Sequence, residues 1–404
     1  MGDDRPRVAA DAMTGRASVV YLVPDKLGGM MNIIANLLAH RRPDDLGYHA
    51  ILTHNQLHTD TRFAAPLAAD TQTTVEYTLP IENLHAVMRR VARAVPAGGG
   101  VYVAGDLLDL AVASTFDFGK TVVYMLHGDT EYYYDLAVKH DPIVHAFITY
   151  SRRMHDELAA RLPHRQSTIL HLPYGIPLPV VVRQQAPGPL RAVYAGRFEN
   201  GQKGIFDLPE IDRALQARGI DVIWTVAGAG PDAAEFKRRW AFNQTVRWRG
   251  RLSAPELIAE YAQQDIFVLP TRFEGFPVAL VEAMGAALVP VVSDIASGVP
   301  EVVEAASGVR VAVGDVPGFA AAIATLAADR GRLEAMSTAA RHTVAARFDI
   351  RDRASDYQSL YARWRELYSP IAPGRYLRYG SRLDQRWIPN AVVRIVRSTL
   401  RAAR

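Results

Sequence analysis

Residues 270–290, PTRFEGFPVALVEAMGAALVP, carry two glutamates, Glu274 and Glu282, in an otherwise nearly uncharged apolar run. The run follows a strand-like segment, IFVLP at 266–270, and continues into a helix-like segment, VALVEAMGAAL at 278–288. Pro277 precedes that segment, and proline is favoured at the start of a helix. The sequence therefore predicts a strand–loop–helix unit, with Glu274 in the loop and Glu282 within the helix.

The two carboxylates need partners. A carboxylate removed from water is costly unless it is paired or hydrogen-bonded. The start of the expected helix also presents free backbone N–H groups, which form a ready anion site. The segment thus offers carboxylates that accept hydrogen bonds from hydroxyls, beside amides that donate to phosphate or sugar oxygens. A nucleotide sugar requires both kinds of group. The alternative is a buried helix whose glutamate pairs with a distant arginine.

Alternating strand and helix patterns extend in both directions from this unit. They predict an α/β protein with two Rossmann-like halves, each built on a doubly wound parallel sheet. A proline-rich stretch at about 174–190 separates the halves as a linker. Ligands of such sheets bind beyond the carboxyl ends of the strands. The expected strands are 18–25, 48–54, 100–105, 121–128, 146–151, 167–175, 190–196, 221–228, 245–250, 266–270, 289–294 and 308–313, and the expected helices are 30–40, 84–95, 152–162, 206–218, 232–240, 254–263, 278–288, 319–328 and 330–347.

Composition narrows the class of protein. The 404 residues suffice for two or three domains, and 49% apolar and 22% charged residues are ordinary for a globular chain. The absence of cysteine excludes disulfides, thiolate zinc sites and a cysteine nucleophile. The polar N-terminus lacks the apolar core of a signal peptide, and no apolar run approaches the length of a spanning helix. We expect a cytoplasmic protein whose residues 1–16 form a disordered tail.

The net charge of +4 is unevenly distributed. Residues 371–404 contain eight arginines and one aspartate, a net +7, which leaves −3 for the first 370 residues. The basicity is therefore a feature of the C-terminal end, and we expect no nucleic-acid partner.

A loop with two cations follows the strand pattern at 190–196. It reads GRFENGQKG and places Arg197 and Lys203 at the mouth of the second sheet. A guanidinium fork and a flexible ammonium suit a diphosphate, and fixed cations stabilise the charge that develops when a nucleoside diphosphate leaves. There is no Asp-x-Asp motif, so no metal is expected. The alternative is a solvated surface pair.

Two further loops end strands of the second half. AGAGP, 227–231, contains Gly230, and glycines let backbone approach a ligand. RGRLSAPEL, 249–257, places Gly250 and Arg251 after another strand. An ordinary Gly-Pro turn and an ordinary loop before a helix capped by Ser253 are the alternatives.

Taken in order, GRFENGQKG, VAGAGP and RGRLSAPELIAEYAQQDIFVLPTRFEGFPVALVEAMGAALVPVVSD resemble the donor domain of the retaining glycosyltransferases of family 4, which have the GT-B fold. The family signature is Glu, seven residues, Glu, and Glu274 and Glu282 fit it. The resemblance is strong over about 190–310 and extends over about 18–368. It implies a metal-independent enzyme with a UDP- or GDP-linked sugar donor and no further cofactor.

The resemblance also implies roles for the site residues. Arg197 and Lys203 would hold the diphosphate, although six positions separate them rather than the family's usual five. Glu282 would accept both ribose hydroxyls, and Glu274 would contact hydroxyls of the donor sugar. The remaining residues of the second half would line the donor: the amides of Gly275 and Phe276 facing the sugar ring or phosphate, and Gly230 and Arg251 near the base and nucleotide.

Two motifs of the first half complete the expected site. In DKLGGMMNIIANLL, 25–38, Gly28 and Gly29 resemble the family's glycine loop, which lets backbone approach donor phosphate or acceptor; a tight turn is the alternative. In MLHGDTEYYYDLAVKH, 125–140, the resemblance points to His127 as the active-site histidine near the transferred sugar. A neutral histidine could orient a sugar hydroxyl there. A structural histidine that caps the strand is the alternative.

The C-terminal end adds two segments. We expect an acceptor domain at 17–175, a donor domain at 190–350 and a helix at 351–370 that crosses back to the first domain. Residues 371–404 form a basic amphipathic extension, with Arg394, Arg397, Arg401 and Arg404 at helical spacing. This pattern suits an anionic membrane surface near a glycan or lipid-linked acceptor. The alternative is a helix packed on the protein.

The expected reaction is transfer of a sugar to an acceptor hydroxyl with retained anomeric configuration, as used in cell-surface glycan or exopolysaccharide assembly. Two alternatives share the architecture: a GT-B sugar-nucleotide epimerase, and a noncatalytic nucleotide-sugar-binding partner.

Overall fold

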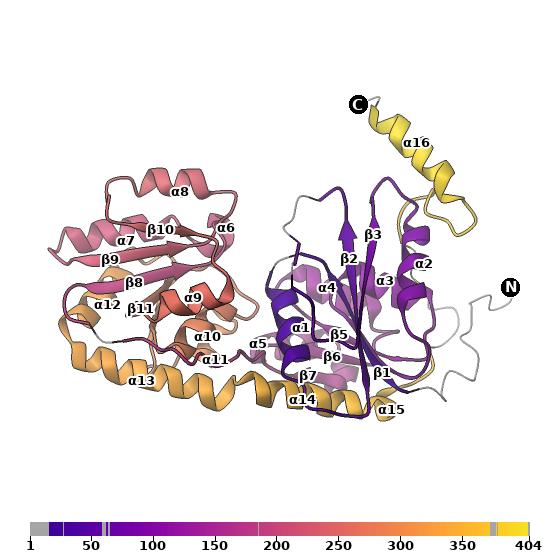
Figure 1. The fold of residues 1–404 in the computed structure, drawn as a ribbon, viewed down its shortest axis with the longest axis horizontal. Coiled ribbons are helices and arrows are strands. Elements are labelled where there is room, and N and C mark those ends of the chain that lie inside the picture. Colours follow the sequence, from indigo (N-terminus) through magenta and orange to yellow (C-terminus); the bar gives the residue numbers. More distant parts are fainter. Residues whose placement is uncertain are drawn as a thin grey trace. The chain divides into compact units, whose positions relative to one another are not determined.

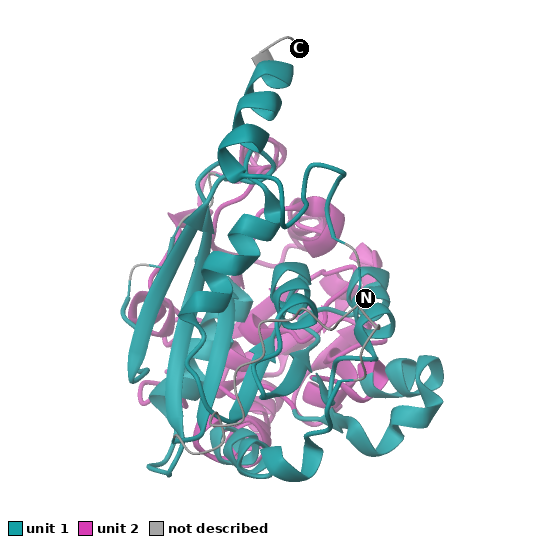
Figure 2. Ribbon diagram, turned by 90° about the vertical axis from the view of Figure 1, so that its right-hand side faces the viewer, with its two compact units in different colours: residues 1–149, 155–172, 353–404 teal, residues 150–154, 173–352 magenta. Residues whose placement is uncertain are grey.

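The computed structural model describes residues 16–26, 28–58, 62–63, 65–184, 186–371, 377 and 379–402. The chain forms two compact units (Figure 2), unit 1 with residues 1–149, 155–172 and 353–404, and unit 2 with residues 150–154 and 173–352. Apart from Arg16, the expected disordered tail at 1–16 lies outside the described residues. Within the described ranges, no helix combines the length and the apolar character needed to cross a bilayer.

Unit 1 is built on a seven-stranded sheet in the described residues, with the order β3-β2-β1-β4-β5-β6-β7. All neighbouring strands are parallel. The central strands are buried along their whole length, as expected when helices cover both faces of a parallel sheet. The strands are β1 Ser18–Pro24, β2 Gly47–Asn55, β3 Thr71–Tyr77, β4 Gly100–Ala104, β5 Thr121–Met125, β6 Ala146–Thr149 and β7 Ile169–His171.

The helices of unit 1 include the crossovers of this sheet and the C-terminal segments (Figure 1). They are α1 Gly29–Ala39, α2 Leu84–Ala94, α3 Leu107–Thr115, α4 Glu131–His140, most of α5 Arg152–Arg161, the 3₁₀ helix η2 Pro163–Thr168, most of α14 Ile350–Ala362, α15 Trp364–Leu367 and α16 Asn390–Ala402. The helix α14 begins in unit 2 and continues into unit 1.

Unit 2 repeats the architecture with a six-stranded parallel sheet in the order β10-β9-β8-β11-β12-β13, counted over the described residues. The strands are β8 Leu190–Ala195, β9 Val222–Ala227, β10 Arg247–Gly250, β11 Ile266–Leu269, β12 Val289–Ser293 and β13 Val309–Val311. The helices are α6 Asn200–Lys203, α7 Asp207–Gln216, α8 Ala233–Arg239, α9 Ala254–Tyr261, α10 Val278–Gly285, α11 Val299–Val302, α12 Val316–Ala328 and α13 Arg330–Arg347.

Each sheet has one topological switch point, where the strand order reverses. In unit 1 it lies between β1 and β4, and in unit 2 between β8 and β11. The loops that leave neighbouring strands in opposite directions open a crevice at such a point. The two Rossmann-like halves predicted from the sequence are confirmed, and the loops after β8 and β11 are where unit 2 should bind a ligand.

The sequence prediction missed several elements. The strand β3, TQTTVEY, is an edge strand with Val75 as its one buried residue, so it shows no apolar alternation. The helix α3, LLDLAVAST, is buried over most of its length and therefore has no polar face to reveal a helical period. The helices α4 and α11 were also missed, and α12 begins three residues earlier than expected, at Val316, where Asp315 caps it.

Candidate functional site

The switch point of unit 2 brings together the cation of one loop and the carboxylate of the next. Lys203, which ends α6 after β8, lies with its Nζ 2.6 Å from Oε1 of Glu274, which follows β11. Thr271 Oγ1 donates a second hydrogen bond to the same oxygen, at 3.0 Å. The side chains of Lys203 and Glu274 are only 17% and 7% exposed. The two loops thus hold a largely desolvated ion pair.

Main-chain and side-chain bonds fix these two loops to each other. The carbonyl of Gln202 accepts a hydrogen bond from the amide of Arg272 at 2.7 Å, and it lies 3.0 Å from Thr271 Oγ1. Arg272 also forks onto both oxygens of Asp207, at 2.7 and 2.8 Å. A bidentate pair of this kind is geometrically specific. The position of Lys203 opposite Glu274 is therefore fixed by its neighbours.

Glu282 lies in α10, and its electrostatic environment differs from that of Glu274. Burial raises its pKa from 4.5 to about 7. Its carboxyl group makes no hydrogen bond or ion pair among the described residues. The hydroxyl of Tyr261, at the end of α9, is also buried without a hydrogen-bond partner in the described structure, and burial and then the charge of Glu282 raise the pKa of Tyr261. Glu282 is thus an acceptor that the described protein leaves unused.

Anion donors flank these carboxylates. Arg197 is exposed, and its guanidinium makes no hydrogen bond or ion pair with the described residues, while its carbonyl accepts from Tyr194 at 2.7 Å. The amides of Gly275 and Phe276, just before α10, likewise donate to no acceptor in the described ranges. A free guanidinium and free amides before a helix are suited to a phosphate oxygen.

The loops after β8, β9 and β10 pack together through glycines. A Cβ on Gly230 would lie 2.2 Å from the carbonyl oxygen of Phe198, so a side chain there would push apart the loops after β8 and β9. The amide of Gly228 donates to the carbonyl of Gly250 at 2.6 Å, and the next residue, Arg251, is exposed. Gly230 is therefore needed for close backbone packing against the loop that carries Arg197.

In unit 1, His127 follows β5, next to the switch point between β1 and β4. It is partly buried, and burial lowers its pKa from 6.5 to about 3, so the ring is neutral near pH 7. A Cβ on Gly105, which follows β4, would lie 2.7 Å from Nε2 of His127. The sequence analysis missed Gly105, whose lack of a side chain makes room for the imidazole.

Gly28 and Gly29 lie between β1 and α1. Both are exposed, and a Cβ on either would meet no atom within 4 Å. The φ of Gly28 is 168°, which is extended backbone open to any residue. Neither crowding nor a left-handed turn therefore requires glycine here. The start of α1 has no side-chain cap.

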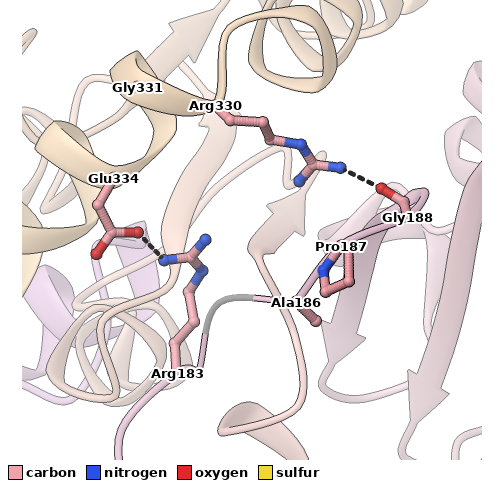
Figure 3. A pocket seen from close by; sticks show the side chains of 7 residues that line it. All are labelled: Arg183, Ala186, Pro187, Gly188, Arg330, Gly331 and Glu334. Atoms are coloured by element: carbon pink, nitrogen blue, oxygen red, sulfur yellow. Dashed lines mark hydrogen bonds and ion pairs between the residues drawn. The ribbon is translucent and has the colours of Figure 1, made fainter.

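A hollow in unit 2 is lined by Arg183, Arg330 and Glu334 among others (Figure 3). Arg183 donates to Glu334 at 2.6 Å and to Asp265 at 3.1 Å. Asp265 immediately precedes β11 and accepts from Arg191, near the start of β8. This cluster therefore belongs to the amino ends of the strands, opposite the candidate site.

Comparisons with known proteins show which family and which relatives the chain resembles. Residues 189–329 match the family Glycosyl transferases group 1. A glycogen synthase of Mycobacterium tuberculosis is 28% identical over 226 residues, which are 54% of this chain and 53% of that protein. A GDP-mannose:cellobiosyl-diphosphopolyprenol alpha-mannosyltransferase of Xanthomonas campestris is 25% identical over 304 residues, 69% of this chain and 78% of that one. The match thus spans about half the length of the glycogen synthase.

Solved structures show the same fold. A sucrose-phosphate synthase from Thermosynechococcus elongatus superimposes with a TM-score of 0.67 at 17% identity, covering 87% of this chain and all of that one. HepE of Anabaena, in complex with UDP and glucose, superimposes with a TM-score of 0.67 at 16% identity, covering 86% and 99% of the two chains. The chain therefore has the GT-B fold, and it matches the Glycosyl transferases group 1 family over residues 189–329.

Proposed function

We propose that this protein is a retaining glycosyltransferase that moves a sugar from a nucleoside diphosphate to an acceptor hydroxyl. The observation that carries the proposal is the ion pair between Lys203 and Glu274, because it joins a phosphate-type cation to a hydroxyl-type acceptor at the switch point of unit 2. A ligand that needs both groups at once is a phosphorylated sugar. The match of residues 189–329 to a glycosyltransferase family supports the same class of ligand.

The surrounding groups divide the donor between them. Arg197 and Lys203 would bind the diphosphate, and the free amides of Gly275 and Phe276 would donate to the sugar or a phosphate oxygen. Glu282 would accept the two ribose hydroxyls with its two carboxylate oxygens, which supplies the hydrogen bonds that it lacks in the described protein. Gly230 and Arg251 would border the base and nucleotide.

In the transfer itself, the bond between the anomeric carbon and the diphosphate oxygen breaks, and the acceptor oxygen forms a bond to the same face of that carbon. The departing phosphate takes the acceptor's proton. Arg197 and Lys203 stabilise the charge that grows on the diphosphate, which is a large catalytic contribution in a preorganised site. Because these two cations balance the negative charge on the diphosphate, we propose that the reaction needs no metal. The neutral His127 would orient a hydroxyl of the transferred sugar, and Gly28 and Gly29 would let backbone approach donor phosphate or acceptor.

The relatives support the proposed substrates. The name of the X. campestris relative specifies a GDP-linked sugar and a polyprenol-linked acceptor, and HepE was solved with UDP and glucose. We propose a UDP- or GDP-linked donor and a glycan or lipid-linked acceptor at the cytoplasmic face of a membrane, as in cell-surface glycan or exopolysaccharide assembly.

A two-step experiment tests this function. Thermal-shift screening against UDP, GDP, ADP and their sugars should identify the donor, because a ligand of the native state raises its apparent stability. Turnover with that donor and an acceptor extract, with and without EDTA, should then give a product whose anomeric configuration, read by NMR, matches the donor. A product with inverted anomeric configuration would refute retention. Loss of turnover in EDTA would refute metal independence. Formation of an isomerised donor in the absence of acceptor would identify an epimerase. Unchanged turnover of Glu274→Gln would refute the site.

A further inference from the structure

The C-terminal helix α16 and the turn before it carry an exposed apolar surface. Trp387, Ile395 and Leu400 are 75%, 68% and 61% exposed, and Val392 and Val396 are also exposed. At 3.6 residues per turn, the four aliphatic residues lie on one side of α16, while Arg394 and Arg401 lie on the other. In Figure 1 the helix extends from unit 1 at the end of the chain.

Among the described residues, unit 1 holds this helix along one edge. Val393 is fully buried. The side chain of Asn390 accepts from the amide of Asn83 at 2.8 Å and donates to Glu82 at 2.9 Å. Arg397, one turn further on the same edge as Val393, donates to the carbonyl of Glu82 at 2.6 Å. These contacts fix the helix to the start of α2 and leave its apolar side uncovered by the described residues of unit 1.

The polar side of this segment is basic. The exposed charged side chains of the described residues 379–402 are Arg382, Arg386, Arg394 and Arg401. The one acidic residue of that range, Asp384, is largely buried, and its Oδ2 lies 2.7 Å from Arg397. The segment therefore combines an exposed apolar strip with a basic polar side, and its one described acid is paired with Arg397. Arg375, Arg378 and Arg404 lie outside the described residues.

We propose that the apolar surface formed by Trp387, Val392, Ile395, Val396 and Leu400, together with the arginines of the same segment, docks unit 1 onto an anionic lipid bilayer. A helix with an apolar face and a basic polar face lies in the plane of a membrane, with the apolar side chains at the boundary of headgroups and acyl chains. Tryptophan is enriched at that level, and arginines bind the acidic headgroups. The proposal does not depend on which donor or reaction the protein uses.

Charge distinguishes this partner from a second copy of the chain. A second copy of the chain would cover the apolar strip but would leave the arginines on the other side of α16 without an anionic partner. An anionic bilayer satisfies the apolar strip and the arginines together. A nucleic acid would meet the arginines and leave the strip in water.

Vesicle binding by the full-length protein tests the proposal. It should sediment with phosphatidylglycerol-containing vesicles and far less with pure phosphatidylcholine, and binding should weaken as salt rises. Trp387 provides a built-in probe, because Trp224, Trp240 and Trp364 are buried and Trp248 is partly buried. Tryptophan emission should therefore shift to the blue on binding, and Trp387→Phe should lose most of that shift.

Matched variants locate the surface. Ile395→Asp with Leu400→Asp should abolish binding, and Arg394→Ala with Arg401→Ala should weaken it by about fivefold per arginine, or roughly 25-fold. Val180→Asp is the control, since Val180 is an apolar residue of unit 2 that is 95% exposed. Thermal melting should show that all variants remain folded. Equal binding to both vesicle types, unchanged binding of the Ile395/Leu400 variant, or a dimer that this variant abolishes in sedimentation equilibrium would overturn the proposal.

Discussion

The replacement Glu282→Gln should stabilise the empty protein and weaken nucleotide binding. The pKa of Glu282 is raised from 4.5 to about 7, so the folded protein holds this proton more tightly than the unfolded chain does. The energetic penalty of ionising the buried carboxyl is therefore absent below pH 4.5, grows between the two pKa values and is complete above pH 7. At 1.36 kcal/mol per pKa unit, it amounts to at most about 3 kcal/mol.

The variant removes this penalty because an amide does not ionise. At pH 8, Glu282→Gln should raise the melting temperature of the empty protein by up to roughly 6 to 12 °C, and at pH 4.5 it should change it little. The variant should also bind the donor nucleotide roughly 10- to 150-fold more weakly, because a charge-assisted hydrogen bond contributes about 1.5–3 kcal/mol. Calorimetric scans and titrations with the nucleotide identified by screening measure both quantities.

The pH dependence of nucleotide affinity in the same titrations tests whether the ionised form of Glu282 binds the ribose diol. If the diol binds the carboxylate, affinity in the natural protein should fall about tenfold per pH unit below pH 7, and Glu282→Gln should show no such slope. Glu210→Gln is the control, since Glu210 is an exposed residue of α7 that should leave both readouts unchanged. A variant that melts lower at pH 8, or binds the nucleotide as tightly as the natural protein, would refute this account of Glu282.

Three further predictions follow from the site geometry. Gly230→Ala should lower turnover strongly and destabilise unit 2, because its Cβ would lie 2.2 Å from a backbone oxygen. Gly28→Ala is the control and should leave the melting temperature unchanged. Equal melting temperatures of the two variants would contradict this prediction. Lys203→Met should cost about 3–5 kcal/mol of stability, because it leaves the buried carboxylate of Glu274 without its cation. Adding Glu274→Gln to this variant should restore stability but not turnover. Denaturant unfolding measures the stability, and activity assays measure the turnover. His127 should contribute no titration to the pH–rate profile between pH 5 and 8, because its pKa is lowered to about 3, and loss of a limb in that range in His127→Gln would disprove its neutrality.

The sequence predicted the parts of the fold whose residues have a clear period or a clear boundary. The apolar strands β8 and β11 and the helix that carries Glu282 were found because a short apolar run lies between turn residues. The edge strand β3 could not be found, because six of its seven residues escape full burial and carry no core pattern. Its existence depends on hydrogen bonds to β2, which are a tertiary property.

The candidate site was predictable at the level of loops but not of contacts. The positions of Arg197, Lys203, Glu274 and Glu282 after strands of one sheet follow from chain order alone. The pairing of Lys203 with Glu274 does not, because it depends on β8 and β11 being neighbours. The outward side of α16 was equally unpredictable, since spacing defines two faces and only the contacts of α16 with unit 1 decide which one the protein covers.

The ion pair between Lys203 and Glu274 has a consequence for turnover under the proposed function. When a diphosphate binds the ammonium of Lys203, the carboxylate of Glu274 loses its counter-charge at a position that is largely shielded from water. An intact donor compensates at once, because its sugar hydroxyls reach that carboxylate. The nucleoside diphosphate product has no sugar hydroxyls, so its binding would leave the carboxylate of Glu274 without a partner. Such an arrangement would favour loading of fresh donor over retention of the by-product and would thereby limit product inhibition.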